Sequence, residues 1–114
     1  MAKILIVDDS RTSRKILRTI LEGAGHEVIG EAVDGVNKFQ ELSPEITTLD
    51  ITMPNMDGLE ALKEIKKVNA DAKIIMVTAA GQQNKMVEAI KSGASEFVTK
   101  PFEAEEIVAL IAKM

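Results

Sequence analysis

The sequence contains no cysteine, which excludes disulfide bonds and metal sites built on thiolates. The absence suits a reducing compartment, and we expect a cytoplasmic protein. No apolar run approaches the roughly 20 residues that cross a bilayer, so we expect no membrane partner. The residues after Met1 lead directly into a strand pattern, without the apolar segment of a signal peptide.

Positive charge and histidine are also scarce. The chain has 14 Lys and Arg against 18 Asp and Glu, a formal net charge of −4. A negative protein is repelled by phosphate backbones, so we expect no nucleic-acid partner. His26 is the only histidine and follows Gly25 just before a predicted strand. We interpret it as a surface turn residue, at the opposite rim from the acidic residues described below, rather than as a phosphohistidine.

The hydrophobic content, at 46%, is that of an ordinary globular protein, and 114 residues suffice for one core. We therefore expect a single domain over residues 1–114. Continuous apolar runs alternate with stripes of helical spacing, and no repeat or linker interrupts them. Strands are predicted at 3–7, 27–32, 46–49, 73–77 and 96–99, and helices near 10–25, 36–42, 59–68, 86–90 and 103–113.

This alternation predicts an α/β fold in which a five-stranded parallel sheet carries helices on both faces, a three-layer αβα sandwich. The first, third and fourth runs are the most apolar, which favours placing them in the centre. That suits the strand order 2-1-3-4-5, one that known doubly wound sheets adopt; the pattern alone does not specify it.

Polar residues stand at the carboxyl ends of four predicted strands. Asp8 and Asp9 follow the first strand, Asp50 the third, Thr78 the fourth and Lys100 the fifth. Parallel strands share one carboxyl rim, and open α/β sheets bind ligands there. We therefore expect these side chains to meet in one pocket.

The charge of that pocket predicts a divalent cation. Three carboxylates and one ammonium sum to −2, which one Mg²⁺ would neutralise. Two like charges about 4 Å apart repel by roughly 4 kcal/mol at an effective dielectric of about 20. A carboxylate held beside such a cation can become a phosphoryl acceptor. Taken singly, each acid could equally cap a helix or face solvent in a turn.

As an ordered set, these residues resemble response-regulator receiver domains. The resemblance covers the whole chain and implies a flavodoxin-like fold. The segments 50–54 and 81–83 are most similar to the stand-alone receivers of chemotaxis. The motifs that carry the resemblance are Asp8-Asp9, Asp50 with Met53-Pro54, Asp57-Gly58, Thr78-Ala79 and Lys100-Pro101-Phe102.

The resemblance implies a phosphoryl-accepting metal site. Asp50 would accept the phosphoryl group from a histidine kinase. Asp9 and Asp50 would bind Mg²⁺ directly, together with the backbone carbonyl of Thr52, and Asp8 would hold a metal-bound water.

The resemblance also implies a switch. Lys100 would pair with the phosphoryl oxygens, Thr78 would move toward them, and Phe97 would turn inward behind Thr78. The chain would thus be a signalling switch that phosphorylates and dephosphorylates itself, and not an enzyme acting on a separate substrate.

The implied partners are a histidine kinase, a downstream target such as the flagellar motor switch, and a phosphatase, with the chain itself a monomer. Three alternatives stay open. The chain could be a receiver from another phosphorelay or from a longer regulator. It could be a receiver-like domain that never carries phosphate. It could also be a phosphatase of the haloacid dehalogenase type, although Asp8-Asp9-Ser10 does not match the Asp-x-Asp motif of that class.

Overall fold

The computed structural model describes residues 2–8, 10–32, 39, 44–50, 58–78, 83–100 and 103–113. The side chains at 32, 58, 59 and 83–86 are outside this description. The helix predicted near 36–42 also lies outside it, except for Phe39, which is helical and buried.

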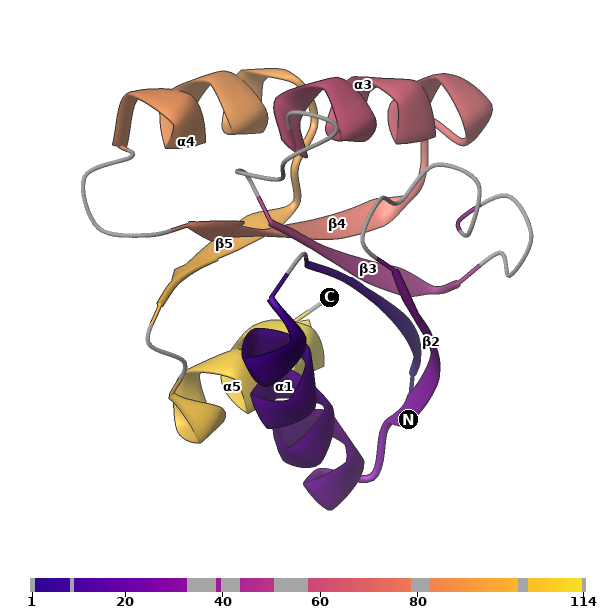
Figure 1. The fold of residues 1–114 in the computed structure, drawn as a ribbon. Helices are drawn as coiled ribbons and strands as arrows, with labels where there is room; N and C mark the ends of the chain where they lie inside the picture. Colours follow the sequence, from indigo (N-terminus) through magenta and orange to yellow (C-terminus); the bar gives the residue numbers. More distant parts are fainter. Residues whose placement is uncertain are drawn as a thin grey trace.

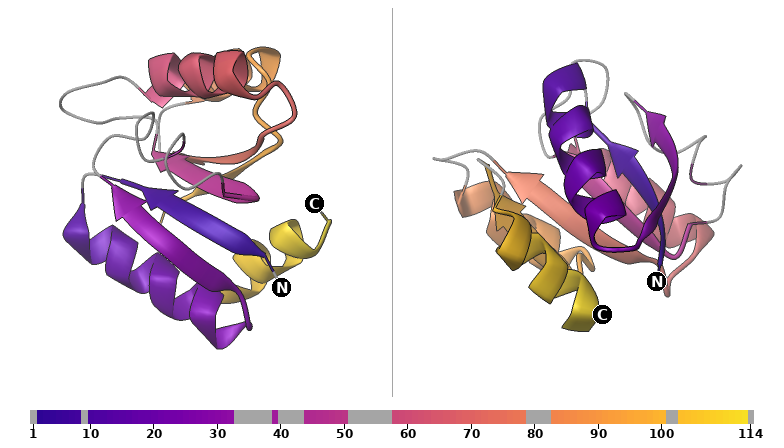
Figure 2. Two further views of the ribbon diagram at one scale, coloured as in Figure 1. Left: turned by 90° about the vertical axis from the view of Figure 1, so that its right-hand side faces the viewer. Right: turned by 90° about the horizontal axis from the view of Figure 1, so that it is seen from below.

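Five parallel strands form one sheet in the order β2-β1-β3-β4-β5. The arrowheads of β1 and β2 point the same way in the left view of Figure 2. The predicted strand order is confirmed, and β1, β3 and β4 are the central strands as expected. The strands are β1 (Lys3–Val7), β2 (Glu27–Ala32), β3 (Ile46–Asp50), β4 (Lys73–Thr78) and β5 (Glu96–Thr99).

Helices cover both faces of this sheet. In Figure 1, α1 (Arg11–Gly23) and α5 (Ala104–Lys113) lie on one face, and α3 (Gly58–Val68) and α4 (Gln83–Lys91) lie on the other. This is the three-layer αβα arrangement, flavodoxin-like in its strand order. None of the described helices combines the length and apolarity that crossing a bilayer requires.

The core has two halves, one on each side of the sheet. In β1, Leu5 and Val7 belong to the cluster that includes α3, whereas Ile4 and Ile6 belong to the cluster that includes α1 and α5. Successive side chains of a strand point to opposite faces, so a central strand covered on both sides must be apolar throughout. This is why the strands could be predicted as continuous apolar runs.

Both ends of α1 are fixed by local hydrogen bonds. Ser10 caps the first turn, where its hydroxyl accepts a hydrogen bond from the Ser13 amide at 3.2 Å. At the other end Gly25 has φ of +88°, and the His26 amide donates to the Leu21 carbonyl at 3.0 Å. The cap holds the first turn of α1 directly beside the end of β1.

The spacing of Met86, Val87 and Ile90 predicts the helix near 86–90 and suggests that these side chains pack inward, which is wrong in part. Val87 and Ile90 are 56% and 45% exposed, and Ala89 is the residue that packs into the core. Ile16 in the predicted stripe of α1 is likewise 46% exposed. A stripe of small and large apolar residues is compatible with more than one rotation of a helix, and only the packing of neighbouring elements selects one.

Candidate functional site

Four predicted site residues lie at the carboxyl rim of the sheet. Asp8 follows β1 directly, Asp50 ends β3, Thr78 ends β4, and Lys100 follows β5. Because β1, β3, β4 and β5 are successive strands across the sheet, the four residues come from neighbouring strand ends. These four of the polar residues predicted to share a rim therefore do so.

Lys100 lies between Asp8 and Asp50. Its Nζ is 3.1 Å from Oδ2 of Asp8 and 3.6 Å from Oδ2 of Asp50. The side chains of Asp8 and Asp50 are only 4% and 9% exposed, and that of Lys100 is 26% exposed. One ammonium thus bridges two buried carboxylates, and these three groups carry a net charge of −1.

The carboxylate of Asp8 is oriented by its own loop as well as by Lys100. Its Oδ1 accepts a hydrogen bond from the Ser10 amide at 2.8 Å, which is the local turn that an aspartate before a helix favours. This satisfies one oxygen and leaves Oδ2 directed at Lys100. Asp8 thus takes part both in the turn that enters α1 and in the ion pair with Lys100.

Thr78 lies beside the same corner, fully buried at the end of β4. Its hydroxyl donates to Oγ1 of Thr99 at 3.5 Å, which is long for a hydroxyl hydrogen bond and therefore weak. Its carbonyl accepts from the Lys100 amide at 2.8 Å, which ties the residue after β5 to the end of β4. Lys100 is thus fixed at its main chain, and Thr78 has a hydroxyl that a stronger acceptor could recruit.

Phe97, on β5, is 39% exposed. Phe97 is paired with Met76 in the β4–β5 register and precedes Lys100 by three residues. Phe97 is thus partly exposed to solvent in this structure, and the predicted inward movement would be a change from that position.

Two predicted metal ligands, Asp9 and the carbonyl of Thr52, lie outside the described residues, as do Met53, Asp57 and Pro101. Within the described ranges, no group of three His, Cys, Asp or Glu side chains could hold a metal ion. The described part nevertheless suits a hard cation, because Asp8 and Asp50 offer buried carboxylate oxygens at one corner with a residual negative charge.

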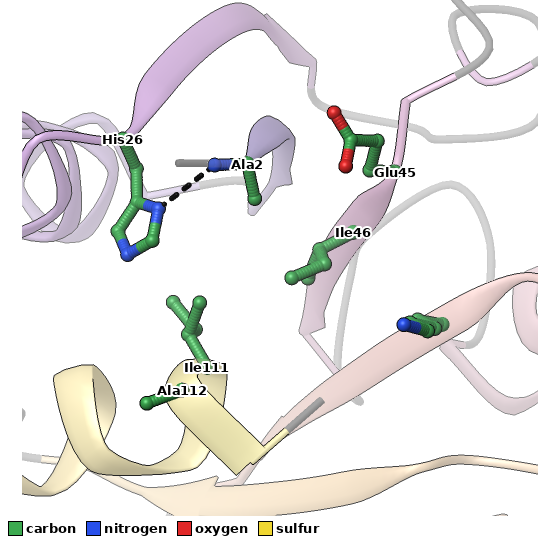
Figure 3. Close-up of a pocket in the computed structure, with 7 residues that line it drawn as sticks. Ala2, His26, Glu45, Ile46, Ile111 and Ala112 are labelled. Carbon is green, nitrogen blue, oxygen red and sulfur yellow. Dashed lines mark hydrogen bonds between the residues drawn. The ribbon is translucent and has the colours of Figure 1, made fainter.

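His26 lies at the opposite rim, as predicted. Its Nδ1 accepts a hydrogen bond from the Ala2 amide at 3.0 Å and so connects the turn after α1 to the start of β1. Figure 3 shows it beside a pocket of about 300 Å³. The lining residues are Ala2, His26, Glu45, Ile46, Lys73, Ile111 and Ala112, none of which comes from the carboxyl rim.

Sequence reasoning did not find Arg14. Its Nη1 donates to the main-chain carbonyl of Asp8 at 2.6 Å, and its Nε is 3.3 Å from Oε1 of Glu31 on β2. A contact between a side chain and a carbonyl leaves no mark in the pattern of residue types. The only available signal was a basic residue one turn into the helix that begins at the site.

The comparisons with known proteins agree with this geometry. The model of the response regulator receiver domain family matches residues 4–112. The chemotaxis protein CheY of Thermotoga maritima is 48% identical, over 98% of this chain and 96% of that protein. The chemotaxis protein CheY of Bacillus subtilis is also 48% identical, over 97% of this chain and 95% of that protein.

Among solved structures, the CheX-CheY-BeF3-Mg+2 complex from Borrelia burgdorferi contains a chain that superposes with a TM-score of 0.92. It is 34% identical in sequence, and the match covers 97% of this chain and 87% of that one. The phosphatase alternative of the haloacid dehalogenase type loses its basis, because the match to another family spans nearly the whole chain. The chain belongs to the response regulator receiver domains of two-component signalling.

Proposed function

We propose that this receiver accepts a phosphoryl group on Asp50 and uses it to change which protein it binds. The observation that carries the proposal is the position of the Lys100 ammonium, within 4 Å of both buried carboxylates. Asp50 combines a buried carboxylate, a strand end at the ligand-binding rim and a neighbouring cation. Phosphoryl transfer needs little more than positioned charge and hydrogen-bond donors.

In the proposed transfer, a carboxylate oxygen of Asp50 attacks the phosphorus of a phosphohistidine on a histidine kinase. The P–O bond to Asp50 forms as the P–N bond breaks, and the leaving imidazole nitrogen takes a proton. Hydrolysis by water later returns the carboxylate and inorganic phosphate, unaided or assisted by a phosphatase. Lys100 is close enough to follow the new negative charge, because its Nζ lies 3.6 Å from Asp50 already.

We assign a Mg²⁺ ion to the same corner, with Asp8, Asp9, Asp50 and the carbonyl of Thr52 as the residues that would hold it. When bound, it would neutralise the charge of the phosphoryl oxygens during transfer. The support is the donor set, which is all oxygen and carries excess negative charge. The similar chain from Borrelia burgdorferi was solved as a complex with BeF3 and Mg+2, which is consistent with the assignment.

We infer that the output is a shift between two conformers of Thr78, Phe97 and the face around them. The buried Thr78 hydroxyl is weakly bonded, and a phosphoryl oxygen at Asp50 is a stronger acceptor. Phe97 on β5 and two residues of α4, Val87 and Ile90, are exposed large apolar residues. A change at Phe97 would alter an apolar surface that a partner can bind.

We propose chemotaxis as the setting, with a target such as the flagellar motor switch and with the chain acting as a monomer in the cytoplasm. The support is the similarity to the chemotaxis proteins of Thermotoga maritima and Bacillus subtilis, each at 48% identity. We propose further that residues 1–114 form one receiver domain, which agrees with a family match over 4–112. Binding to the purified motor-switch protein, measured with and without a phosphoryl mimic, tests this setting.

The chemistry is tested with a small phosphoryl donor, which removes the need for a kinase. The chain is incubated with acetyl phosphate and Mg²⁺, and its intact mass is measured. We expect a single labile phosphoryl adduct that is lost in EDTA. A chain that gains no adduct under these conditions would instead be a receiver-like interaction domain.

A further inference from the structure

Arg14 is connected to the site without being one of its predicted members. Its guanidinium contacts two groups at once, the main-chain carbonyl of Asp8 at 2.6 Å and the carboxylate of Glu31 at 3.3 Å. Its side chain is only 17% exposed. The arginine therefore joins three elements, since it stands on α1, pairs with β2 and bonds to the end of β1.

We propose that Arg14, held by Glu31, is a positioning residue of the metal corner, which fixes the main chain at Asp8 so that the Asp8 carboxylate faces the site. The inference rests on the proposed function, because it concerns how that same corner binds Mg²⁺. Arg14 acts through Asp8 and would not itself touch the ion.

The end of β1 requires such a restraint. Asp8 directly follows the last residue of β1, and the chain turns from there into α1. Its carboxylate is held by the Ser10 amide and by Lys100, but those contacts fix the side chain only. The bond from Arg14 fixes the carbonyl of Asp8, and with it the main chain that carries the Asp8 carboxylate.

Arginine suits this task better than lysine. A guanidinium is planar and presents several N–H donors in fixed directions, so one group can serve a carbonyl with Nη1 and a carboxylate with Nε. An ammonium on a flexible stem keeps the charge but does not reproduce both contacts with one geometry. A substitution of Arg14 by Lys therefore separates the charge of this residue from its shape.

The chain also offers a matched control. Arg18 stands one turn further along α1 and donates to Oε2 of the same Glu31 at 2.5 Å. That hydrogen bond raises the pKa of Arg18. Arg18 also pairs with Glu22 at 3.3 Å, and none of its described contacts reaches Asp8. Removing Arg18 thus perturbs Glu31 and removes one positive charge from α1, but leaves the bond to the Asp8 carbonyl.

The charge of Arg14 and its positioning role predict opposite changes in Mg²⁺ affinity when the residue is replaced. Loss of a positive charge near a cation site should strengthen Mg²⁺ binding, because one repulsive term disappears. Loss of a positioning contact should weaken binding, because the ligands then sample directions away from the ion. The direction of the change in Mg²⁺ affinity therefore distinguishes a positioning role from a simple charge effect.

The experiment measures the Mg²⁺ dissociation constant of the full chain by isothermal titration calorimetry for wild type, Arg14→Met, Arg14→Lys and Arg18→Met. We expect both Arg14 variants to bind Mg²⁺ about tenfold more weakly, a typical effect of losing a residue that orients a metal ligand. We expect Arg18→Met to bind at least as tightly as wild type. Phosphorylation by acetyl phosphate should recover in the Arg14 variants as Mg²⁺ is raised, which a general loss of structure would not allow.

The outcomes separate this inference from the proposed function. Wild-type chain that neither binds Mg²⁺ nor gains a phosphoryl adduct would overturn both. Normal wild type together with an Arg14→Lys variant of unchanged Mg²⁺ affinity would overturn the positioning role alone, since charge would then suffice. Tighter binding by Arg14→Met would overturn it as well. Arg14→Lys keeps the test decisive if Arg14→Met does not fold.

Discussion

The two rims of the sheet differ in whether their charged side chains are buried or exposed. At the carboxyl rim, Asp8 and Asp50 are buried against one ammonium, that of Lys100. At the amino rim, Lys3, Glu45 and Lys73 stand on the same strands or beside them but are exposed. Exposed charges cost little and interact weakly, whereas buried charges are held only where they are paired or bind ions. Among the described residues, the carboxyl rim is therefore the candidate for an ion-binding or reactive site.

The largest effect is expected from a pair of substitutions at opposite ends of the β3 segment. Asp50→Asn should abolish the phosphoryl adduct completely, because an amide oxygen is no nucleophile for phosphorus at neutral pH. Glu45→Gln, at the exposed amino end, should leave the adduct unchanged. Intact mass after incubation with acetyl phosphate and Mg²⁺ measures both. A full adduct in Asp50→Asn would place the acceptor elsewhere.

Removing a lysine should have unequal effects on stability at the two rims. Lys100→Met leaves two buried carboxylates without their shared ammonium, and we expect the free energy of unfolding in EDTA to fall by about 2 kcal/mol. Lys73→Met, at an exposed position, should change it by less than about 0.5 kcal/mol. Urea unfolding is followed by circular dichroism, because the chain has no Trp or Tyr. If both substitutions lowered the free energy of unfolding equally, the two rims would not differ in how strongly their charges stabilise the fold.

The hydroxyl of Thr78 can be compared with hydroxyls in the middle of the sheet. Thr78→Val should still form the adduct, but the ring resonances of Phe97 should no longer shift when beryllofluoride and Mg²⁺ are added as a phosphoryl mimic. Thr48→Val should keep that shift. If Phe97 responds equally in Thr78→Val, then Thr78 does not carry the switch.

The control substitution Thr48→Val should itself have a small effect on the free energy of unfolding. Within the described part of the chain, the buried hydroxyls of Thr47 and Thr48 have no hydrogen-bond partner. Replacing such a hydroxyl by a methyl group of the same shape removes an uncompensated polar group. We expect Thr48→Val to raise the free energy of unfolding by up to about 1 kcal/mol, again measured in urea. A loss of stability would mean that this hydroxyl is bonded in solution.

The smallest effects are expected from two glycines near the amino rim. Gly25 has φ of +88°, so Gly25→Ala should cost about 1 kcal/mol of stability. Gly23 is helical, and an added methyl group would meet nothing within 4 Å, so Gly23→Ala should gain about 0.5 kcal/mol. Neither substitution should alter the phosphoryl adduct. Thermal unfolding of the two variants measures the opposite signs.

Much of this fold could be predicted from the sequence, because its strands are buried on both faces. Residues 4–7 and 74–77 have no polar member, and a continuous apolar run of this length between helical stripes indicates a central parallel strand. The site followed from the same pattern, since Asp8, Asp50 and Lys100 each stand where a run ends. The strand ends alone were enough to bring these three charges together.

What could not be predicted depends on packing between elements. The exposure of Val87 and Ile90 follows from how α4 lies on the sheet, and their residue types suggest burial. The bond from Arg14 to the Asp8 carbonyl depends on how α1 packs against the sheet beside β2. Neither property belongs to a local pattern, and both concern surfaces or contacts that bear on function.

The most direct test of the central claim identifies the phosphorylated residue itself. The chain is phosphorylated with acetyl phosphate and Mg²⁺, the acyl phosphate is reduced with borohydride, and the digested peptides are mapped by mass spectrometry. Reduction converts a phosphorylated aspartate into homoserine. The account predicts homoserine at position 50 and at no other aspartate. Homoserine at another position, with Asp50 unchanged, would contradict it.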